Sequence, residues 1–236
     1  MAATRSGERS TAATAATGPV GPSVPVGPAG AGSGLAGGVR VGRYLVRPAG
    51  PEDVGGARSV MLDTIYGDLR SAYVPRWHRD VIDIEGGYLT PDRHTLLVAE
   101  LEGLVVATGA VRSQGPAHPP NPRWVAERFP SGTTAQLCRV YVRPEHRRAG
   151  LARAIVRELR AFVARAGGYR SIYLHTDPAV PGAEAFWRSV GRVVCDEREL
   201  PGGGQGILHV ELPMGSATAD ADGSPGGGEP SDRGGE

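Results

Sequence analysis

A basic turn containing a glycine stands at residues 147–152, where the sequence reads Arg-Arg-Ala-Gly-Leu-Ala. An apolar run ending at Val142 precedes it, Pro144 stops that run from continuing as a strand, and a helical pattern follows. The first turn of a helix has unpaired backbone N–H groups and a partial positive charge, so it attracts phosphate. Gly150 and its small neighbours would let the backbone approach a pyrophosphate closely. The turn is therefore a candidate anion site, although an ordinary strand–loop–helix joint has the same pattern.

Two side chains outside this turn could move a proton. His175 ends the apolar run that follows the helix, and because histidine titrates near neutrality it is the preferred titrating residue. Glu100 ends an earlier apolar run and is a second candidate base. Each has a plainer interpretation, which is a packed strand histidine for the first and a solvated turn carboxylate for the second.

Three further side chains have reactive types but ordinary explanations. Tyr141 could be a phenolic acid, yet it stands between two core-facing valines, which predicts that it faces the other side of the sheet. Cys138 could be a nucleophile, but a small buried hydrophobic residue is far more common. Asp177 is expected to cap the turn before the next helix.

The elements that must position these residues give a mixed α/β pattern around one central sheet. Strands are predicted at residues 44–47, 95–100, 104–111, 135–142, 171–175, 193–195 and 207–210. Helices are predicted at residues 51–70, 75–84 (ended by Gly86-Gly87), 151–166 and 181–190. Residues 114–134 are rich in Pro and Gly and are predicted to form a long loop, which is usually functional or mobile.

Composition sets the boundaries of the domain. Residues 1–40 and 214–236 have too few apolar side chains to offset the entropy of ordering them, which predicts disordered tails around a single domain at 41–213. The net charge is +1, so nucleic acid is not an expected partner. No stretch is apolar enough to span a membrane, and the two cysteines make no disulfide framework. We therefore expect a cytoplasmic protein, either a monomer or a homodimer.

The chain from about residue 43 to 212 resembles the GNAT superfamily of N-acetyltransferases, and the resemblance is specific at 137–191. The family motif is Gln or Arg, two residues, Gly, one residue, then Gly or Ala, and it is met by Arg147, Gly150 and Ala152. A second matching block runs from Pro181 to Gly191.

The resemblance implies a fold, an activity and a site. The fold is an α/β, GNAT-like mixed central sheet with splayed strands, flanked by helices. The activity is an acyl-CoA-dependent N-acyltransferase, in which an amine attacks acetyl-CoA directly in a ternary complex and no metal takes part. The cofactor-binding residues carried over are Val140, Tyr141 and Val142 along the pantetheine arm and Arg147, Arg148, Ala149, Gly150, Leu151 and Ala152 around the pyrophosphate. Trp187 is expected to form a wall at the pantetheine end because of its large apolar face.

The sequence departs from the family at four positions. Many members have Gly where Arg148 stands, a carboxylate at about Gln136, Asn where Val180 stands and Tyr where Trp187 stands. An indole N–H only donates hydrogen bonds and cannot protonate a leaving thiolate usefully. The base and the acid are therefore open, and a catalytically weak acyl-CoA-binding or sensor domain of the same fold is the alternative. An unrelated glycine-rich nucleotide binder is a further rival.

The amine acceptor is a small molecule or a protein amine, and the sequence does not choose between them. Aromatic side chains that could line its pocket are Tyr73, Trp77, His78, Tyr88 and Trp124. Ordinary packing under a pair of helices would explain the same residues.

Overall fold

A computed structural model describes residues 38–69 and 72–214. Its eight strands form one sheet in the order β1-β2-β3-β4-β5-β6-β8-β7. The strands are β1 Val39–Val41, β2 Tyr44–Pro48, β3 Thr95–Leu101, β4 Leu104–Ser113, β5 Thr134–Val142, β6 Ser171–Thr176, β7 Arg192–Asp196 and β8 Leu208–Leu212. The pair β5–β6 is parallel and the other pairs are antiparallel.

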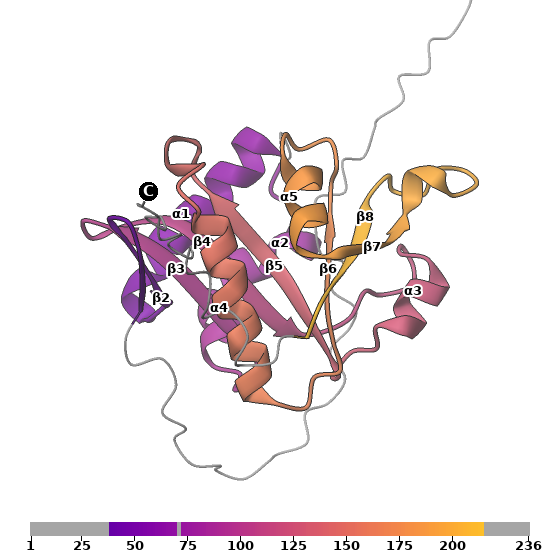
Figure 1. Ribbon diagram of the computed structural model, residues 1–236, viewed down its shortest axis with the longest axis horizontal. Coiled ribbons are helices and arrows are strands. Elements are labelled where there is room, and N and C mark those ends of the chain that lie inside the picture. The colour runs from indigo at the N-terminus through magenta and orange to yellow at the C-terminus, as the bar shows by residue number, and fades with distance from the viewer. Residues whose placement is uncertain (1–37, 70–71, 215–236) are drawn as a thin grey trace, which may run out of the picture.

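Helices cover both faces of the sheet. The α-helices are α1 Val54–Asp63, α2 Pro75–Ile82, α3 Arg123–Arg128, α4 Leu151–Ala166 and α5 Ala183–Val190. Shorter helical turns are η1 Pro51–Asp53, η2 Thr64–Asp68, η3 Glu85–Leu89, η4 Pro144–His146 and η5 Glu197–Glu199. In Figure 1, α4 crosses the front of the sheet, α5 lies on the same side, and α1 and α2 lie behind it. The site therefore belongs to a three-layer α/β domain with a core on each face.

The long helix α4 packs closely on the sheet because a strand glycine makes room for it. Its buried stripe includes Ile155 and Leu159, as the helical period predicts. A Cβ atom at Gly109 of β4 would lie 2.3 Å from Cγ2 of Ile155. Any side chain at this position would therefore push away the helix whose N-terminus forms the predicted anion site.

The central strands β5 and β6 part after a short parallel ladder. Their register pairs Thr134 to Gln136 with Ser171 to Tyr173 and extends no further among the described residues. Both strands nevertheless run on, to Val142 and to Thr176. The continuing part of β5 therefore presents an edge that β6 does not cover.

A β-bulge lies in β5 where the strands part. Cys138 is opposite Ala110 and Tyr141 is opposite Thr108, so two residues of β5 face one residue of β4. Arg139 takes the positive backbone angle, with φ of 54°, in the left-handed region that non-glycine residues rarely adopt. A bulge bends its strand and increases the local twist, so the end of β5 runs in a different direction from its start.

Several predicted boundaries differ from the structure. Strand β1 includes Val39, which the predicted tail had covered, because its residues pair with β2. The predicted loop at 114–134 contains α3, and the double glycine at 86–87 lies inside η3 instead of ending a helix. The predicted helix at 51–70 divides into η1, α1 and η2. The remaining predicted tail residues, 1–37 and 215–236, lie outside the described residues.

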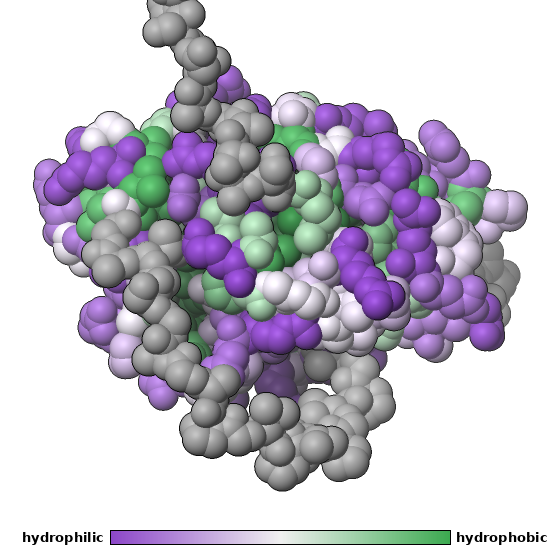
Figure 2. All heavy atoms as spheres, turned by 60° about the horizontal axis from the view of Figure 1, so that its bottom comes forward, coloured by the Kyte–Doolittle hydropathy of each residue, from purple (hydrophilic) through white to green (hydrophobic). Residues whose placement is uncertain are grey.

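Polar side chains dominate the visible surface. On the face shown in Figure 2, purple residues surround green ones that gather towards the middle and the left. Large apolar side chains that are exposed in the described part of the chain are Tyr66, Ile82, Leu104, Trp124 and Met214. No helix among residues 38–69 and 72–214 is long and apolar enough to cross a bilayer.

Candidate active site

A groove of about 430 Å³ lies where β5 and β6 separate. Its walls come from η2, the end of β5, the start of α4, the end of β6 and α5. The residues lining it are Thr64, Asp68, Leu69, Val140, Tyr141, Val142, His146, Arg147, Arg148, Gly150, Leu151, Ala152, Arg153, Thr176, Asp177, Val180, Pro181, Gly182, Ala183, Phe186 and Trp187. The groove therefore joins the two sequence blocks on which the resemblance rests.

The predicted anion turn forms one end of this groove. Gly150 is the N-cap of α4 with φ of 79°, and its carbonyl accepts the first helical hydrogen bond from the N–H of Ala154. The N–H groups of the first turn are thus left for an outside acceptor. Arg148 also has a positive φ, 65°, which is a physical reason for a glycine to be favoured at this position.

The three arginines around the turn are not equivalent. Arg143 pairs with Asp63 and donates to Ser59, and Arg147 pairs with Asp68 and donates to the carbonyl of Val142 at 3.0 Å. Among the described residues, Arg148 has no hydrogen bond or ion pair and is exposed. Surface carboxylates therefore already hold two of these arginines, and the side chain of Arg148 is the one of the three that is left for an anion.

Nine of the ten predicted cofactor-binding residues line the groove, and the exception is Ala149. Val140 and Val142 pack on the α4 face of the sheet while Tyr141 packs on the opposite face, as their alternation predicts. Trp187 is buried and meets Phe186 edge to face, with ring centroids 4.8 Å apart. Cofactor binding by these residues stays a prediction.

His175 is half-buried on β6, two residues beyond the last one that pairs with β5; it does not itself line the groove, although its neighbour Thr176 does. The hydroxyl of Tyr173 is 3.4 Å from its Nδ1. Burial first, and then the nearby groups of His209, Arg112 and Arg139, lower the pKa of His175 to about 3. The prediction that it titrates near neutrality is therefore wrong, and His175 is neutral at physiological pH.

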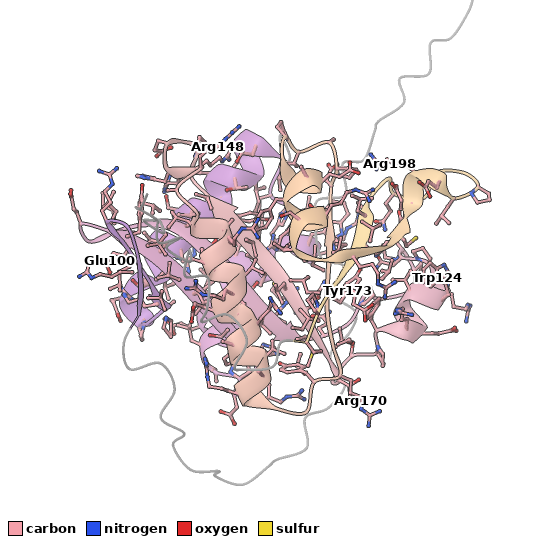
Figure 3. All side chains as sticks on the ribbon, viewed as in Figure 1. Glu100, Trp124, Arg148, Arg170, Tyr173 and Arg198 are labelled. Carbon is pink, nitrogen blue, oxygen red and sulfur yellow. The ribbon has the colours of Figure 1, made fainter. Side chains whose placement is uncertain are left out.

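The structure does not bring Glu100 to the groove. Its carboxylate accepts hydrogen bonds from Arg47 at 2.8 and 3.2 Å, and Arg47 also binds Asp53. Figure 3 shows Glu100 on the β2–β3 side of the sheet, far from Tyr173. A carboxylate held there has no route to a group bound in the splay, so the prediction of a base at this position is dropped.

A buried polar cluster that local sequence patterns did not indicate lies behind the bulge. Arg139 donates to both carboxylate oxygens of Asp80, at 2.8 and 2.9 Å, and to the carbonyl of Trp77. The hydroxyl of Tyr88 donates to Asp80 and lies 3.6 Å from Sγ of Cys138. Burial would raise the pKa of Asp80, but the charge and hydrogen bonds of Arg139 hold it below its ordinary value. Cys138 is thus a packed side chain of this cluster.

The aromatic candidates for the acceptor pocket divide into two groups. Four of them, Tyr73, Trp77, His78 and Tyr88, lie on or beside α2 and η3, where the carbonyl of Trp77 accepts from Arg139 and the rings of Tyr73 and His78 are in contact. Trp124 is separate, since it lies exposed on α3 (Figure 3). Asp177 caps a turn, as predicted, because its carboxylate accepts the N–H of Ala179 at 2.8 Å.

Among the described residues, no group of three or more His, Cys, Asp or Glu side chains is arranged to hold a metal ion. What the groove offers is a helix N-terminus, a free arginine, an uncovered strand edge and an apolar wall. This combination fits a long ligand that has phosphate at one end and peptide-like groups along its length.

Comparisons with known proteins agree with this geometry. The model of the acetyltransferase (GNAT) family matches residues 62–191, which is more than half of the chain. N-acetyltransferase 8 of Rattus norvegicus is 34% identical over 116 residues, which cover 48% of this chain and 46% of that protein. The chain thus spans less than half the length of this relative.

Solved structures share the fold at low identity. A GNAT-family acetyltransferase from Staphylococcus aureus Mu50 has a TM-score of 0.54 at 12% identity, covering 72% of this chain and 99% of that one. The protein yncA of Salmonella typhimurium, solved with its cofactor acetyl-CoA, has a TM-score of 0.53 at 17% identity, covering 76% and 99%. With the family model matched across both halves of the groove, this chain belongs to the GNAT family of acetyltransferases.

Proposed function

We propose that this protein transfers the acetyl group of acetyl-CoA to an amine by direct attack in a ternary complex. The observation that carries the proposal is the groove, in which the N-terminus of α4, the uncovered edge of β5 and Trp187 line one continuous space. The first turn of α4 and Arg148 would hold the pyrophosphate, and Val140 to Val142 would pair with the pantetheine amides.

The chemistry needs the amine, the thioester and a proton acceptor in one place. The amine nitrogen attacks the thioester carbonyl carbon to form the C–N bond, and the C–S bond breaks. The nitrogen gives up one proton to water and the leaving thiolate takes up one proton from water, so the products are the amide and the CoA thiol. His175 is proposed to accept a hydrogen bond from the attacking amine, because it stands on β6 next to the groove-lining Thr176 and its ring is neutral. Since its pKa is about 3, we expect the acceptor to arrive as the free amine, so the acceptor's own pKa should set the pH profile.

No phenol stands at the position of Trp187, so we propose that water protonates the leaving thiolate. The large face of the indole would close the groove beside the thioester. Much of the acceleration would then come from holding the two reactants together, which does not require an acid side chain.

A catalytically weak acyl-CoA-binding domain is the second candidate. The observation that favours it is that Val180 and Trp187 both line the groove, where many family members have Asn and Tyr. Neither side chain can supply the hydrogen bond or the proton that those residues would supply.

A thiol-release assay with acetyl-CoA and a panel of small amines and peptides separates the two candidates. Acyl transfer predicts acceptor-dependent release of CoA that falls at least tenfold in His175→Ala. Binding alone predicts that CoA raises Tm while no acceptor gives turnover. An increase of Tm with ATP or NAD but not with CoA would contradict both.

A further inference from the structure

Three buried side chains form a hydrogen-bonded chain that leads from the β7–β8 hairpin to the half-buried His175. Glu197 Oε1 lies 2.9 Å from His209 Nε2, and His209 Nδ1 lies 2.7 Å from the hydroxyl of Tyr173. The same hydroxyl lies 3.4 Å from Nδ1 of His175. Glu197, His209 and Tyr173 are each at most 1% exposed, so water does not compete for these hydrogen bonds. Figure 3 shows Tyr173 inside the molecule, between β5 and the β7–β8 hairpin.

The hairpin is built to enclose the carboxylate of Glu197. The backbone N–H of Gln205 donates to Glu197 Oε2, while His209 occupies Oε1. A Cβ atom at Gly204, which has φ of 50°, would lie 2.6 Å from Oε2. A side chain there would displace the carboxylate, so the run of glycines at 202–204 allows the loop to close on it.

The direction of every hydrogen bond follows from this carboxylate. An ionised carboxylate only accepts, so Nε2 of His209 must carry the proton and donate to Glu197. Burial lowers the pKa of His209 against the opposing effect of Glu197, so its ring is neutral and its Nδ1 is bare. The hydroxyl of Tyr173 therefore donates to Nδ1 of His209. Its oxygen is then left to accept from Nδ1 of His175.

We propose that Glu197, His209 and Tyr173 are positioning residues that fix the tautomer of His175, with the ring proton on Nδ1 and the lone pair on Nε2. Ring packing supports the arrangement, since Tyr173 lies 6.0 Å from His209 and 6.1 Å from His175 between centroids. The two histidines are also direct partners in the β6–β8 register. The catalytic consequence rests on the proposed function, in which His175 accepts a hydrogen bond from the amine.

Glu197→Gln tests this chain of hydrogen bonds. The variant should reverse the donor and the acceptor in each bond, while the side chain keeps its shape. The N–H of Gln205 needs an acceptor, so the amide oxygen should take the place of Oε2 and the amide NH2 should face His209. That NH2 donates to Nε2 of His209, Nδ1 of His209 then donates to Tyr173, and Tyr173 donates to Nδ1 of His175. The ring proton of His175 should move to Nε2.

The readout is the ¹⁵N NMR spectrum of the histidine ring nitrogens, with His175 assigned through His175→Gln. We expect the Nδ1–H form of His175 in the natural protein and in Glu199→Gln, a matched control with an exposed carboxylate on the same helical turn. We expect the Nε2–H form in Glu197→Gln. Tyr173→Phe leaves Glu197 in place and removes the link, so it should give a mixture of tautomers.

Kinetics separate this inference from the proposed function. If both are right, kcat falls about tenfold or more in Glu197→Gln, as expected for His175→Ala, because a histidine in the wrong tautomer cannot accept the hydrogen bond of the amine. KM for acetyl-CoA should be unchanged, because Glu197 does not line the groove. An unchanged His175 tautomer in both Glu197→Gln and Tyr173→Phe overturns the inference. A changed tautomer with unchanged kcat supports the inference and contradicts the role of His175 in the reaction.

Discussion

Arg139 and Asp80 form a buried, two-pronged ion pair that joins the bulge of β5 to helix α2. Nε and Nη2 of Arg139 donate to the two carboxylate oxygens at 2.9 and 2.8 Å, and the side chains are 0% and 6% exposed. The pair holds a left-handed residue next to the point where β5 and β6 separate. The ion pair thus fixes the point where the two strands separate to the helices on the face of the sheet opposite α4.

Loss of either partner should destabilise the protein strongly. Asp80→Ala would leave a buried guanidinium without its carboxylate, and we expect a loss of about 3–5 kcal/mol in the free energy of unfolding. Asp63→Ala is the matched control, because Asp63 pairs with Arg143 at the surface and should cost about 1 kcal/mol or less. Urea unfolding measures both, and equal losses would contradict the assignment.

Gly150→Ala should weaken CoA binding through the backbone. A Cβ there meets only Cγ1 of Val41, at 3.8 Å, so the cost is strain at φ of 79° of about 1–2 kcal/mol. Relaxing that strain would turn the first N–H groups of α4 away, and we expect Kd for CoA to rise at least tenfold. Gly103→Ala carries the same strain, with φ of 81° in a remote open turn. It should lose similar stability and keep its Kd, which calorimetry can check.

Arg148 should add a salt-dependent part of the CoA affinity. Arg148→Ala is expected to raise Kd several-fold at low salt and to flatten its dependence on ionic strength, because an exposed charge is screened. Arg170→Ala is the control, since Figure 3 shows Arg170 at the opposite end of the molecule from Arg148. Identical salt dependence in the two variants would remove Arg148 from the site.

Trp187 should act as a wall and not as an acid. Trp187→Phe keeps an aromatic face in the groove, so we expect most activity to remain, whereas Trp187→Ala should cost about 3–5 kcal/mol of stability. Trp124→Ala on the exposed face of α3 should change stability by about 0.5 kcal/mol or less. Inactive Trp187→Phe with normal CoA binding would mean that the indole N–H takes part in the reaction.

Mild acid should destabilise the protein through its buried histidines. Burial lowers the pKa values of His78, His94, His175 and His209 in the folded state. The unfolded chain then binds more protons as the pH falls below about 6.5, so stability is complete above that pH and decreases below it. Each histidine contributes up to about 1.4 kcal/mol per pH unit. Urea unfolding from about pH 7 to about pH 5 should show the decrease, and His175→Gln should make it less steep.

Local patterns in the sequence were sufficient for α4, for the turn before it and for most of the strands. The stripe containing Ile155 and Leu159 follows the helical period, and the glycine at 150 marks the helix start, so both can be read from a few neighbouring residues. The alternation of Tyr141 with its two valines likewise predicted opposite faces of the sheet, and the structure confirms it. Helix α3 was missed because it is short and lies among prolines and glycines.

Only the tertiary structure decided which arginines form ion pairs and how far the pKa of His175 is shifted. Arg147 meets Asp68 across 79 positions and Arg139 meets Asp80 across 59, so no local pattern distinguishes them from the free Arg148. The pKa of His175 depends on burial and on groups brought from other strands, whereas its residue type alone predicted titration near neutrality. The physical reason is the sequence distance over which each effect acts. Backbone propensity and periodicity act over one or two turns, whereas desolvation and ion pairing depend on which residues the folded chain brings together in space.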